Sequence, residues 1–425
     1  MARQITTAIA AGVAIITLVL GVVIGFVAYP YVIGPAPAPG PAGLTGEIKI
    51  GSLQPLSGDL ATYGQNSKVA IEFAAEEVND FLEESGANWT LKIVTEDTET
   101  KPDVCLTKLE TLAAQGIKLV VGPMSSGELS NIKGYADANK ILVISQSSTA
   151  PALGIAGDYI FRFCPNDMWQ GRAMARVIYE DGIRYVAAVW RGDAWGDGLE
   201  NQTEIRFEAL GGTFIEGAKI RYTPGLTTYS TEVASLASAV ASAVTTYGAD
   251  KVAVYDIAFE EVTLFLTAAT TYPVLRSVKW YGSDGTTLSQ AMLDDPVSAE
   301  FSNATKFNNP IFTPLRSEKY DRVVARVNQV LNRTPDAYSF PIYDAIWALV
   351  YSLMSVNRYD AEAVRAVLPD VTASLFGASG WTKLDANGDR SPTDYDLWVI
   401  TWEAGAYTWK LIGRWNLDTD TVTWL

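Results

Sequence analysis

Apolar strands and long helices alternate along most of this chain, and the connections between them are short. A strand that is followed by a helix and then by another strand is the repeating unit of a parallel sheet covered by helices. The first run predicts strands at 47–53, 91–95, 119–121 and 141–145, with helices at 63–83, 103–115 and 128–139. The sequence therefore predicts an α/β fold with doubly wound parallel sheets.

The same rhythm returns after residue 166 and predicts a second sheet. Its helices are expected at 169–181, 198–210, 228–247 and 260–271, and its strands at 185–189, 213–220, 251–255 and 277–281. Helices at 316–332 and 338–356 have the length to return to the first part, and strands at 396–402 and 408–415 close the chain.

The chain beyond residue 46 is too long for one hydrophobic core, because cores stop growing at roughly 250–300 residues. We expect two lobes joined by a hinge that the chain crosses more than once. The first lobe comprises 47–165 with about 310–395, and the second comprises 166–309 with about 396–425. Two lobes connected in this way form a cleft between them.

The N-terminal segment predicts attachment to a membrane. Residues 5–33 carry no charge, and a helix of about 20 apolar residues suffices to cross a bilayer. A cleaved secretory signal is the alternative, although its apolar region is usually only about 7–15 residues long. Arg3 before the span places the bulk of the chain outside, at the cell surface or in a periplasm-like space. Residues 34–46, rich in Pro, Ala and Gly, then form a semi-rigid linker after the 1–33 anchor.

Composition excludes several classes of function. The formal charge of −16 and the pI near 4.6 argue against nucleic acid as a partner, since that requires a basic surface. The chain has no histidine, which removes Ser-His and Cys-His nucleophile pairs and all histidine-containing metal sites. Residues 385–391 resemble a calcium loop, but the glycine is displaced and no Glu follows at the twelfth position, so we expect a turn. Paired carboxylates such as Glu76-Glu77 and Glu260-Glu261 could still serve a glycosidase, but they lie on predicted helices, where they are expected to be solvated charges. We expect no catalytic residues, no metal and no cofactor.

Two cysteines and four sequons lie in the part expected outside. Cys105 and Cys164 form a disulfide or stay as two separate buried thiols, and the sequence does not separate these alternatives. Possible glycosylation sites are Asn88, Asn201, Asn303 and Asn332.

Residues 51–64 join the first strand to the first helix through a polar, Gly-rich loop. Such a loop points backbone N–H groups at a small polar ligand. Other segments follow it in a fixed order: EDT at 96–98, VGPMSSG at 121–127, ISQSSTAP at 144–151, FRFCPND at 161–167, WGDG at 195–198 and LDANGDR at 384–390.

With these motifs, the chain resembles the substrate-binding proteins of branched-chain amino-acid ABC importers, the type I periplasmic binding proteins. The resemblance covers nearly all of residues 47–415. It implies a receptor that captures an amino acid with an apolar side chain between two lobes and delivers it to an ABC importer permease. It implies no enzymatic step and no cofactor.

The resemblance also implies a ligand site. Ser126 matches the position that binds the ligand carboxylate through its hydroxyl and backbone N–H. Ser147 matches a position whose carbonyl takes the ligand ammonium, and Thr149 one whose hydroxyl reaches the carboxylate. Asp284, in the sequence YGSDG, matches an acidic position that neutralises the ammonium, although an isolated Asp-Gly is usually a turn.

Three aromatic residues are expected to complete the site. Tyr63 lines the side-chain pocket, while Trp195 and Phe259 close over the ligand from the second lobe. Without the motifs, these rings would be read as ordinary core residues. The segment YDIAF at 255–259 departs from the family pattern and makes Asp256 a candidate for a second acid facing the cleft.

Two other functions stay open. A ligand-sensing ectodomain would need a membrane partner, because only about four residues precede the predicted span. A structural cell-surface protein built on the same fold would have a blocked cleft and would self-associate.

Overall fold

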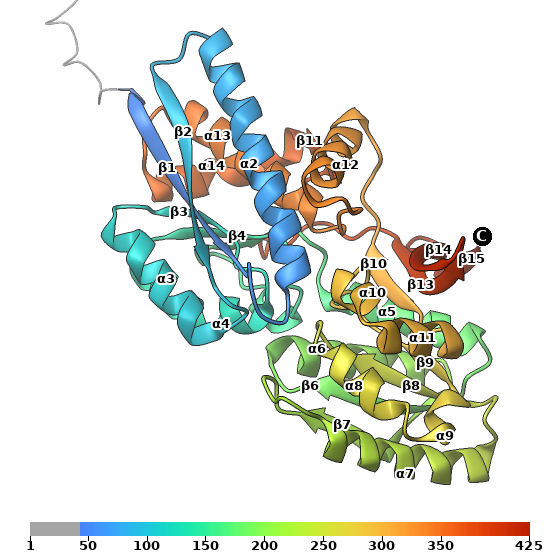
Figure 1. Cartoon of the computed structure of the whole chain (residues 1–425). Coiled ribbons are helices and arrows are strands. Elements are labelled where there is room, and N and C mark those ends of the chain that lie inside the picture. The colour runs from blue at the N-terminus through green and yellow to red at the C-terminus, as the bar shows by residue number, and fades with distance from the viewer. Residues whose placement is uncertain (1–42) are drawn as a thin grey trace, which may run out of the picture. The chain divides into compact units, whose positions relative to one another are not determined.

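The computed structural model describes residues 43–425 (Figure 1). The predicted anchor at 1–33 and most of the predicted linker lie outside the described residues. Gly46–Leu425 form one compact unit.

A five-stranded parallel sheet, here called the β1 sheet, comes first in the chain. Its strand order is β2-β1-β3-β4-β5. The strands are β1 (Gly46–Gln54), β2 (Trp89–Asp97), β3 (Leu119–Val121), β4 (Leu142–Ser145) and β5 (Ile160–Arg162). Because β1 pairs with both β2 and β3, the strand order reverses at β1, and the loops after β1 and β3 flank the crevice where such sheets bind ligands. The first four strands were predicted, whereas β5 was not.

Helices cover both faces of the β1 sheet (Figure 1). On one side α3 (Pro102–Ala114) packs on α4 (Ser126–Ala138) over a core that contains Leu53, Val120 and Val143. On the other side α2 (Ala61–Glu84) packs against two helices from late in the chain, α12 (Glu318–Leu331) and α13 (Ser339–Val356).

The helices that reach the β1 sheet late in the chain are α12 (Glu318–Leu331), α13 (Ser339–Val356) and α14 (Ala361–Ser374). Their packing confirms that this segment returns to the first sheet, as predicted. Within residues 43–425, only α13 is long and apolar enough to cross a membrane, and 72% of its length is buried inside the fold. We therefore describe α13 as a core helix.

A second parallel sheet, the β6 sheet, has the order β7-β6-β8-β9. Its strands are β6 (Tyr185–Arg191), β7 (Thr213–Tyr222), β8 (Val252–Ile257) and β9 (Lys279–Tyr281). Along β8, Ala253 and Tyr255 enter the core beneath α5 (Asp167–Glu180) and α6 (Ala194–Ala209). Val252 and Val254 point the other way, as the two-residue period of a strand requires.

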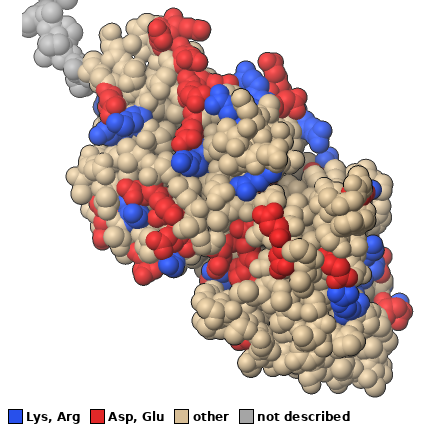
Figure 2. Space-filling view, viewed as in Figure 1, with Lys and Arg blue, Asp and Glu red and all other residues tan. Residues whose placement is uncertain are grey.

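The other face of the β6 sheet is covered by α7 (Ser230–Tyr247) and α8 (Val262–Ala269). Short helices α9 (Pro273–Arg276), α10 (Gln290–Asp294) and α11 (Pro296–Thr305) complete this part. Figure 2 shows that the surface around α7 is almost free of charged side chains, and α7 itself contains one charged residue, Glu232.

The C-terminal strands form an antiparallel sheet of their own, with the order β10-β13-β14-β15. These strands are β10 (Asn309–Phe312), β13 (Tyr395–Glu403), β14 (Ala406–Asn416) and β15 (Thr421–Trp424). A small hairpin of β11 (Phe376–Gly377) and β12 (Gly380–Trp381) stands apart. The strands β13 and β14 were predicted, but β10 was missed because its partner is distant in the sequence and four residues carry little local signal.

A buried ion pair links β5 to the turn at 385–391. The side chain of Arg162 donates to both carboxylate oxygens of Asp389, and both residues are almost fully buried. The backbone N–H of Arg390 also donates to the carbonyl of Arg162, at 2.9 Å. Within the turn, Asp385 Oδ1 accepts from the N–H groups of Asn387 and Asp389 at 2.8 and 3.0 Å. The carboxylates of this calcium-like sequence therefore accept hydrogen bonds that stabilise the turn and its contact with β5.

The two cysteines are separate buried thiols, so the disulfide considered from the sequence is wrong. Cys105 lies on α3 in the core under the β1 sheet. Cys164 follows β5 in a different hydrophobic cluster, with its Sγ 3.6 Å from the carbonyl of Ser148. Of the four sequons, Asn88, Asn201 and Asn332 are exposed and Asn303 is half-buried; glycosylation stays a prediction.

Candidate ligand-binding cleft

A small cavity lies between the β1 sheet and the β6 sheet at the carboxyl ends of their strands. The space open to the centre of a water molecule is about 20 Å³, which is room for about one water. The cavity is lined by Leu60, Tyr63, Met124, Ser125, Ser126, Ser147, Trp195, Phe259, Asp284, Gly285 and Tyr338. Six of the seven predicted site residues are among them, and Thr149 is the exception. The cleft is therefore closed around the residues that the sequence proposed.

The first turn of α4 supplies hydrogen-bond donors to the cavity. Ser125 caps the helix: its Oγ accepts from the N–H of Glu128 at 3.2 Å, and the Glu128 carboxylate accepts from the N–H of Ser125 at 3.1 Å. Ser126 and Gly127 occupy the next positions, where N–H groups have no acceptor within the helix. This end of α4 therefore favours an anion.

The hydroxyl of Ser126 is oriented by its neighbours. Its Oγ accepts from the Oγ of Ser148 and from the N–H of Ala150, both at 3.1 Å. A hydroxyl oxygen has two acceptor sites and one proton, so the Ser126 proton remains free to donate. This donor role agrees with the role predicted for Ser126 from the sequence.

Ser147 and Thr149 follow β4 on the adjacent loop. The hydroxyl of Ser147 donates to the carbonyl of Met124 at 2.7 Å, so its backbone carbonyl is the group left for a ligand. Thr149 is 2% exposed and does not line the cavity, and its carbonyl accepts from the N–H of Asp167 at 2.9 Å. Its expected contact with a ligand carboxylate stays a prediction.

Tyr63 joins the two sides of the cleft. Its hydroxyl lies 3.0 Å from the carbonyl of Gly285 and 3.2 Å from that of Thr287. Burial raises the pKa of this phenol well above its ordinary value, so the group stays a donor. The neighbouring Gly64 has a steric reason to be glycine, since a Cβ there would lie 2.0 Å from the carbonyl oxygen of Pro55.

Two stacked rings form the wall on the side of the β6 sheet. Trp195 lies on Phe259 with ring centroids 4.5 Å apart and an interplanar angle of 21°. Asp193 holds Trp195 in place, because its Oδ1 accepts from the N–H groups of Trp195 and Gly196 at 3.0 and 2.9 Å. A Cβ at Gly285 would lie 2.7 Å from the Phe259 ring, so glycine at this position leaves room for the ring.

Asp284 is buried against the cavity with part of its hydrogen-bonding capacity unused. Oδ2 accepts from the hydroxyl of Tyr338. Oδ1 is buried and has no hydrogen-bond partner among the described residues. Burial raises the pKa of this carboxyl above its ordinary value. None of the described residues that line the cavity is basic.

A second buried acid, Asp167 at the start of α5, is coupled to Asp284 through Gln170. The amide of Gln170 donates to Asp167 Oδ1 at 3.1 Å and accepts from the N–H of Asp284 at 2.9 Å. Asp167 Oδ2 also lacks a hydrogen-bond partner within residues 43–425. Burial, and then the charge of Asp284, raise the pKa of Asp167 well above its usual range. The arrangement fits a cationic group on the ligand.

The structure corrects one expectation and adds residues. Asp256 is completely buried and does not line the cavity, because its strand neighbours Val254 and Ala258 place it toward the core under α7 and α8. The sequence missed Tyr338 and also Leu60, Met124, Ser125 and Gly285. The only sequence feature at Tyr338 is the predicted start of the helix at 338–356, because no motif surrounds this residue.

The sequence profile of periplasmic binding proteins matches residues 47–406. The chain therefore belongs to the periplasmic binding protein family, and its fold is the type I fold of that family, with parallel sheets. Proteins of this family bind substrates rather than convert them, and membership implies a location outside the cytoplasm.

Individual relatives are similar over most of their length. An uncharacterized protein of Methanocaldococcus jannaschii is 35% identical over 396 residues, covering 89% of this chain and 91% of the relative. A Leu/Ile/Val-binding protein, BraC3 of Rhizobium johnstonii, is 24% identical over 364 residues, or 84% of this chain and 92% of its own. The crystal structure of a leucine binding protein, LivK of Thermotoga maritima, superposes with a TM-score of 0.71 at 19% identity, covering 85% of this chain and 97% of that one.

Proposed function

We propose that this protein captures an amino acid in the cleft and delivers it to the permease of an ABC importer. The observation that carries the proposal is the pairing, in one cavity, of unused donors at the start of α4 with an unpartnered carboxylate oxygen of Asp284. A ligand with one carboxylate and one ammonium would satisfy both, and burying either charge unpaired is costly. The Leu/Ile/Val-binding relative supports the same class of ligand.

The remaining lining favours an apolar side chain. Leu60 and Met124 lie on one side of the cavity, and Trp195 and Phe259 lie on the other. No charged group other than Asp284 lines it within the described part of the chain. A charged ligand side chain would lose its hydration there without compensation.

Closure supplies the mechanism. In this proposal, the lobes comprise 47–165 with about 310–395 and 166–309 with about 396–425. A ligand that contacts both lobes only when they are closed shifts the population toward the closed form by its difference in affinity for the two states. The permease then receives the closed form, while an N-terminal anchor at 1–33 keeps the receptor outside and near the membrane.

The test uses the full chain in mild detergent and follows its melting temperature with added ligands. Leucine is compared with isocaproate, which lacks the ammonium, and with isoamylamine, which lacks the carboxylate. We expect leucine or a close analogue to raise the melting temperature, because ligand at 100 times Kd stabilises by about 2.7 kcal/mol. The two truncated compounds should fail.

Matched variants complete this test. Ser126→Ala and Asp284→Asn should reduce the shift, and Asp284→Asn should reduce it more, whereas Ser235→Ala and Asp250→Asn, at exposed positions on or after α7, should leave it unchanged. If no amino acid shifts the melting temperature, the transport proposal fails. Self-association of a protein that binds no ligand would favour a structural surface protein. A protein that binds an amino acid but delivers it to no permease would instead favour a sensing ectodomain.

A further inference from the structure

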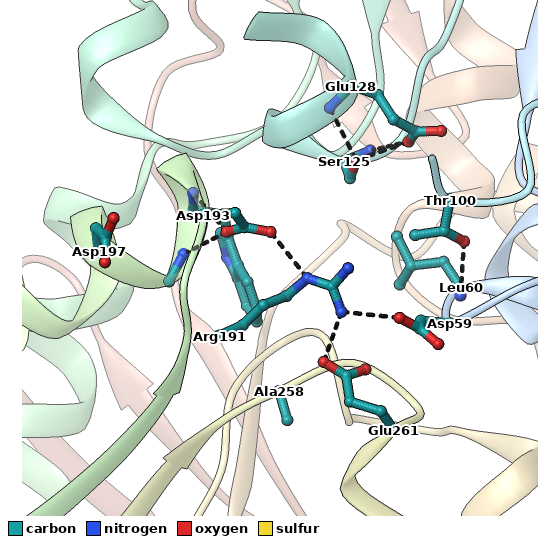
Figure 3. A network of polar contacts seen from close by, with 12 residues as sticks. Asp59, Leu60, Thr100, Ser125, Glu128, Arg191, Asp193, Asp197, Ala258 and Glu261 are labelled. Carbon is teal, nitrogen blue, oxygen red and sulfur yellow. Dashed lines mark hydrogen bonds and ion pairs between the residues drawn. The ribbon is translucent and has the colours of Figure 1, made fainter. Parts of the chain in front are cut away.

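Arg191 ends strand β6. Figure 3 shows its guanidinium among the carboxylates of Asp59, Asp193 and Glu261. Its guanidinium lies 4.5 Å from the centroid of the Phe259 ring, on which Trp195 also stacks. The side chain is only 7% exposed. Phe259 is therefore held in contact with a ring and a cation together.

Two carboxylates on the side of the β6 sheet hold this arginine. Its Nε donates to Asp193 at 2.8 Å, and its Nη1 donates to Glu261 at 2.6 Å. Glu261 in turn accepts from the hydroxyl of Tyr222 at 2.7 Å. Asp193 is the same residue that caps α6 and positions Trp195, so the ion pair and the aromatic wall share an anchor.

A third carboxylate reaches Arg191 from across the cleft. Asp59, on the loop between β1 and α2, accepts from Nη1 at 2.9 Å. Two further contacts cross the cleft nearby. The carbonyl of Asp59 accepts from the N–H of Glu260 at 2.9 Å, and Thr62, at the start of α2, donates to the Glu260 carboxylate through its hydroxyl and its N–H. These contacts exist only when the two sides of the cleft meet.

We propose that Arg191 is a positioning residue that couples closure of the cleft to the placement of the Trp195–Phe259 wall. This inference rests on the proposed function, because it concerns the affinity of the same cleft. When the cleft opens, Arg191 keeps Asp193 and Glu261 but loses Asp59, and the rings lose the crossing contact behind them. When it closes, one guanidinium serves three carboxylates and the ring face.

Lysine cannot replace Arg191 in this role. The planar guanidinium presents donors in several fixed directions and stacks on a ring face, whereas an ammonium is a point charge on a flexible stem. Arg191→Lys therefore keeps the charge and loses the geometry. A role in charge balance alone would be preserved by this substitution.

The decisive variant is Asp59→Asn, which weakens the crossing contact and leaves the contacts behind the wall intact. Because Asp59 is nearly one-third exposed, solvent screens the pair, and we expect leucine to bind about two- to fivefold more weakly, mainly through faster dissociation. The melting temperature without ligand should stay unchanged. Arg191→Lys should produce a loss at least as large, and adding Asp59→Asn to it should cost little more.

The control is Glu300→Gln. Glu300 pairs with Arg276, whose guanidinium lies 5.5 Å from the centroid of the Phe301 ring, so the pair repeats the cation, ring and carboxylate away from the cleft. Dissociation should not change in this variant. If Asp59→Asn lowers the melting temperature and leaves the dissociation rate as in the wild type, the contact is only structural and the inference is wrong.

Hydrogen exchange separates this inference from the proposed function. In the full chain without ligand, Asp59→Asn should speed exchange in peptides covering 59–63 and 259–261, and Glu300→Gln should not. Faster exchange in a protein that binds no amino acid would support the coupling and reject the transport proposal. Unchanged exchange and unchanged affinity in a protein that binds leucine would reject the coupling alone.

Discussion

The two walls of the cleft use their polar groups differently. On the side of the β1 sheet, hydrogen bonds from Glu128, Ser148 and Ala150 hold the hydroxyls of Ser125 and Ser126. The Ser126 hydroxyl proton and the first N–H groups of α4 are left to donate. On the opposite side, Asp284 leaves a buried oxygen without a partner. The donors of the first wall are preorganised, whereas the Asp284 oxygen of the second wall is left to bind a positive group.

A second buried carboxylate shows what an acid with its hydrogen bonds satisfied looks like. Asp344 on α13 is completely buried, and it accepts from the N–H groups of Ala378 and Ser379 at 2.6 and 2.9 Å and from the Ser379 hydroxyl. Its bonds stay within the fold. Comparing Asp344 with Asp284 teaches that unused bonding capacity next to a cavity, rather than burial, marks a binding group.

The largest effect should come from Asp284→Asn. Removing one partner of a buried charge pair costs about 3–5 kcal/mol, so we expect leucine to bind at least about 100-fold more weakly. Calorimetric titration measures this change. The ligand-free variant should be at least as stable as the wild type, whereas Asp344→Asn should be less stable. If both variants lose stability equally, the contrast between the two acids fails.

Ser126→Ala should have the next largest effect. A hydrogen bond to a charged group contributes about 1.5–3 kcal/mol, which corresponds to roughly 10- to 150-fold weaker binding. Ser148→Ala is the matched control, because Ser148 donates to Ser126 and does not line the cavity. It should change the Kd much less. Equal losses in the two variants would mean that Ser126 acts only within the protein.

Lowering the pH should weaken binding before ordinary aspartates protonate. Burial raises the pKa of Asp284 and of Asp167 above the ordinary 3.8, so these carboxyls take up a proton at higher pH than usual and lose their attraction for an ammonium. Titration of Kd against pH should show this loss, and Asp167→Asn should lower the pH at which it begins. A Kd that is constant down to the ordinary aspartate range would contradict the prediction.

The stability of the ligand-free protein should change with pH in the opposite sense. A carboxyl whose pKa is raised by folding binds its proton more tightly in the folded state than in the unfolded state. The contribution of Asp284 and Asp167 to stability is therefore fully present below the unfolded value near 3.8 and is lost as the pH rises through the folded pKa. Thermal melting of the wild type and Asp167→Asn across this range measures that contribution.

Asp256→Asn should have the smallest effect on binding. It tests whether a buried acid without partners acts in binding only when it lines the cavity. Both carboxylate oxygens of Asp256 are buried without partners among the described residues, and burial raises its pKa well above the ordinary value. Because Asp256 does not line the cavity, Kd should be unchanged. In urea unfolding, the variant should be at least as stable as the wild type at neutral pH, because it removes a carboxyl whose charged form is disfavoured by burial. A change in Kd would show that Asp256 acts on the cleft.

The parts of the fold and of the site that could be predicted from the sequence are those that depend on contacts between residues close together in the chain. The helix that begins at Ser126 and the first turn of α2, which carries Tyr63, follow from local features: a capping box, a glycine next to Tyr63, and an apolar strand before each loop. The alternation of strands and helices likewise predicted both parallel sheets.

The rest required contacts between distant segments. Tyr338 reaches Asp284 from the helix that returns to the first sheet, and Asp59 reaches Arg191 across the cleft. Strand β10 exists because β13 pairs with it. No periodicity or motif encodes which distant partner satisfies a side chain, and for the same reason the inward or outward direction of Asp256 depended on the register of β8 with its neighbours.

The two thiols have a practical consequence for labelling. Cys105 and Cys164 are the only cysteines of the chain, both are buried, and burial raises the pKa of each. The thiolate is the form that maleimides and iodoacetamides attack, so the native protein should resist these reagents. One cysteine introduced on each side of the cleft would then carry a fluorescent dye while Cys105 and Cys164 stay in place, and opening of the cleft would be read as a change in energy transfer.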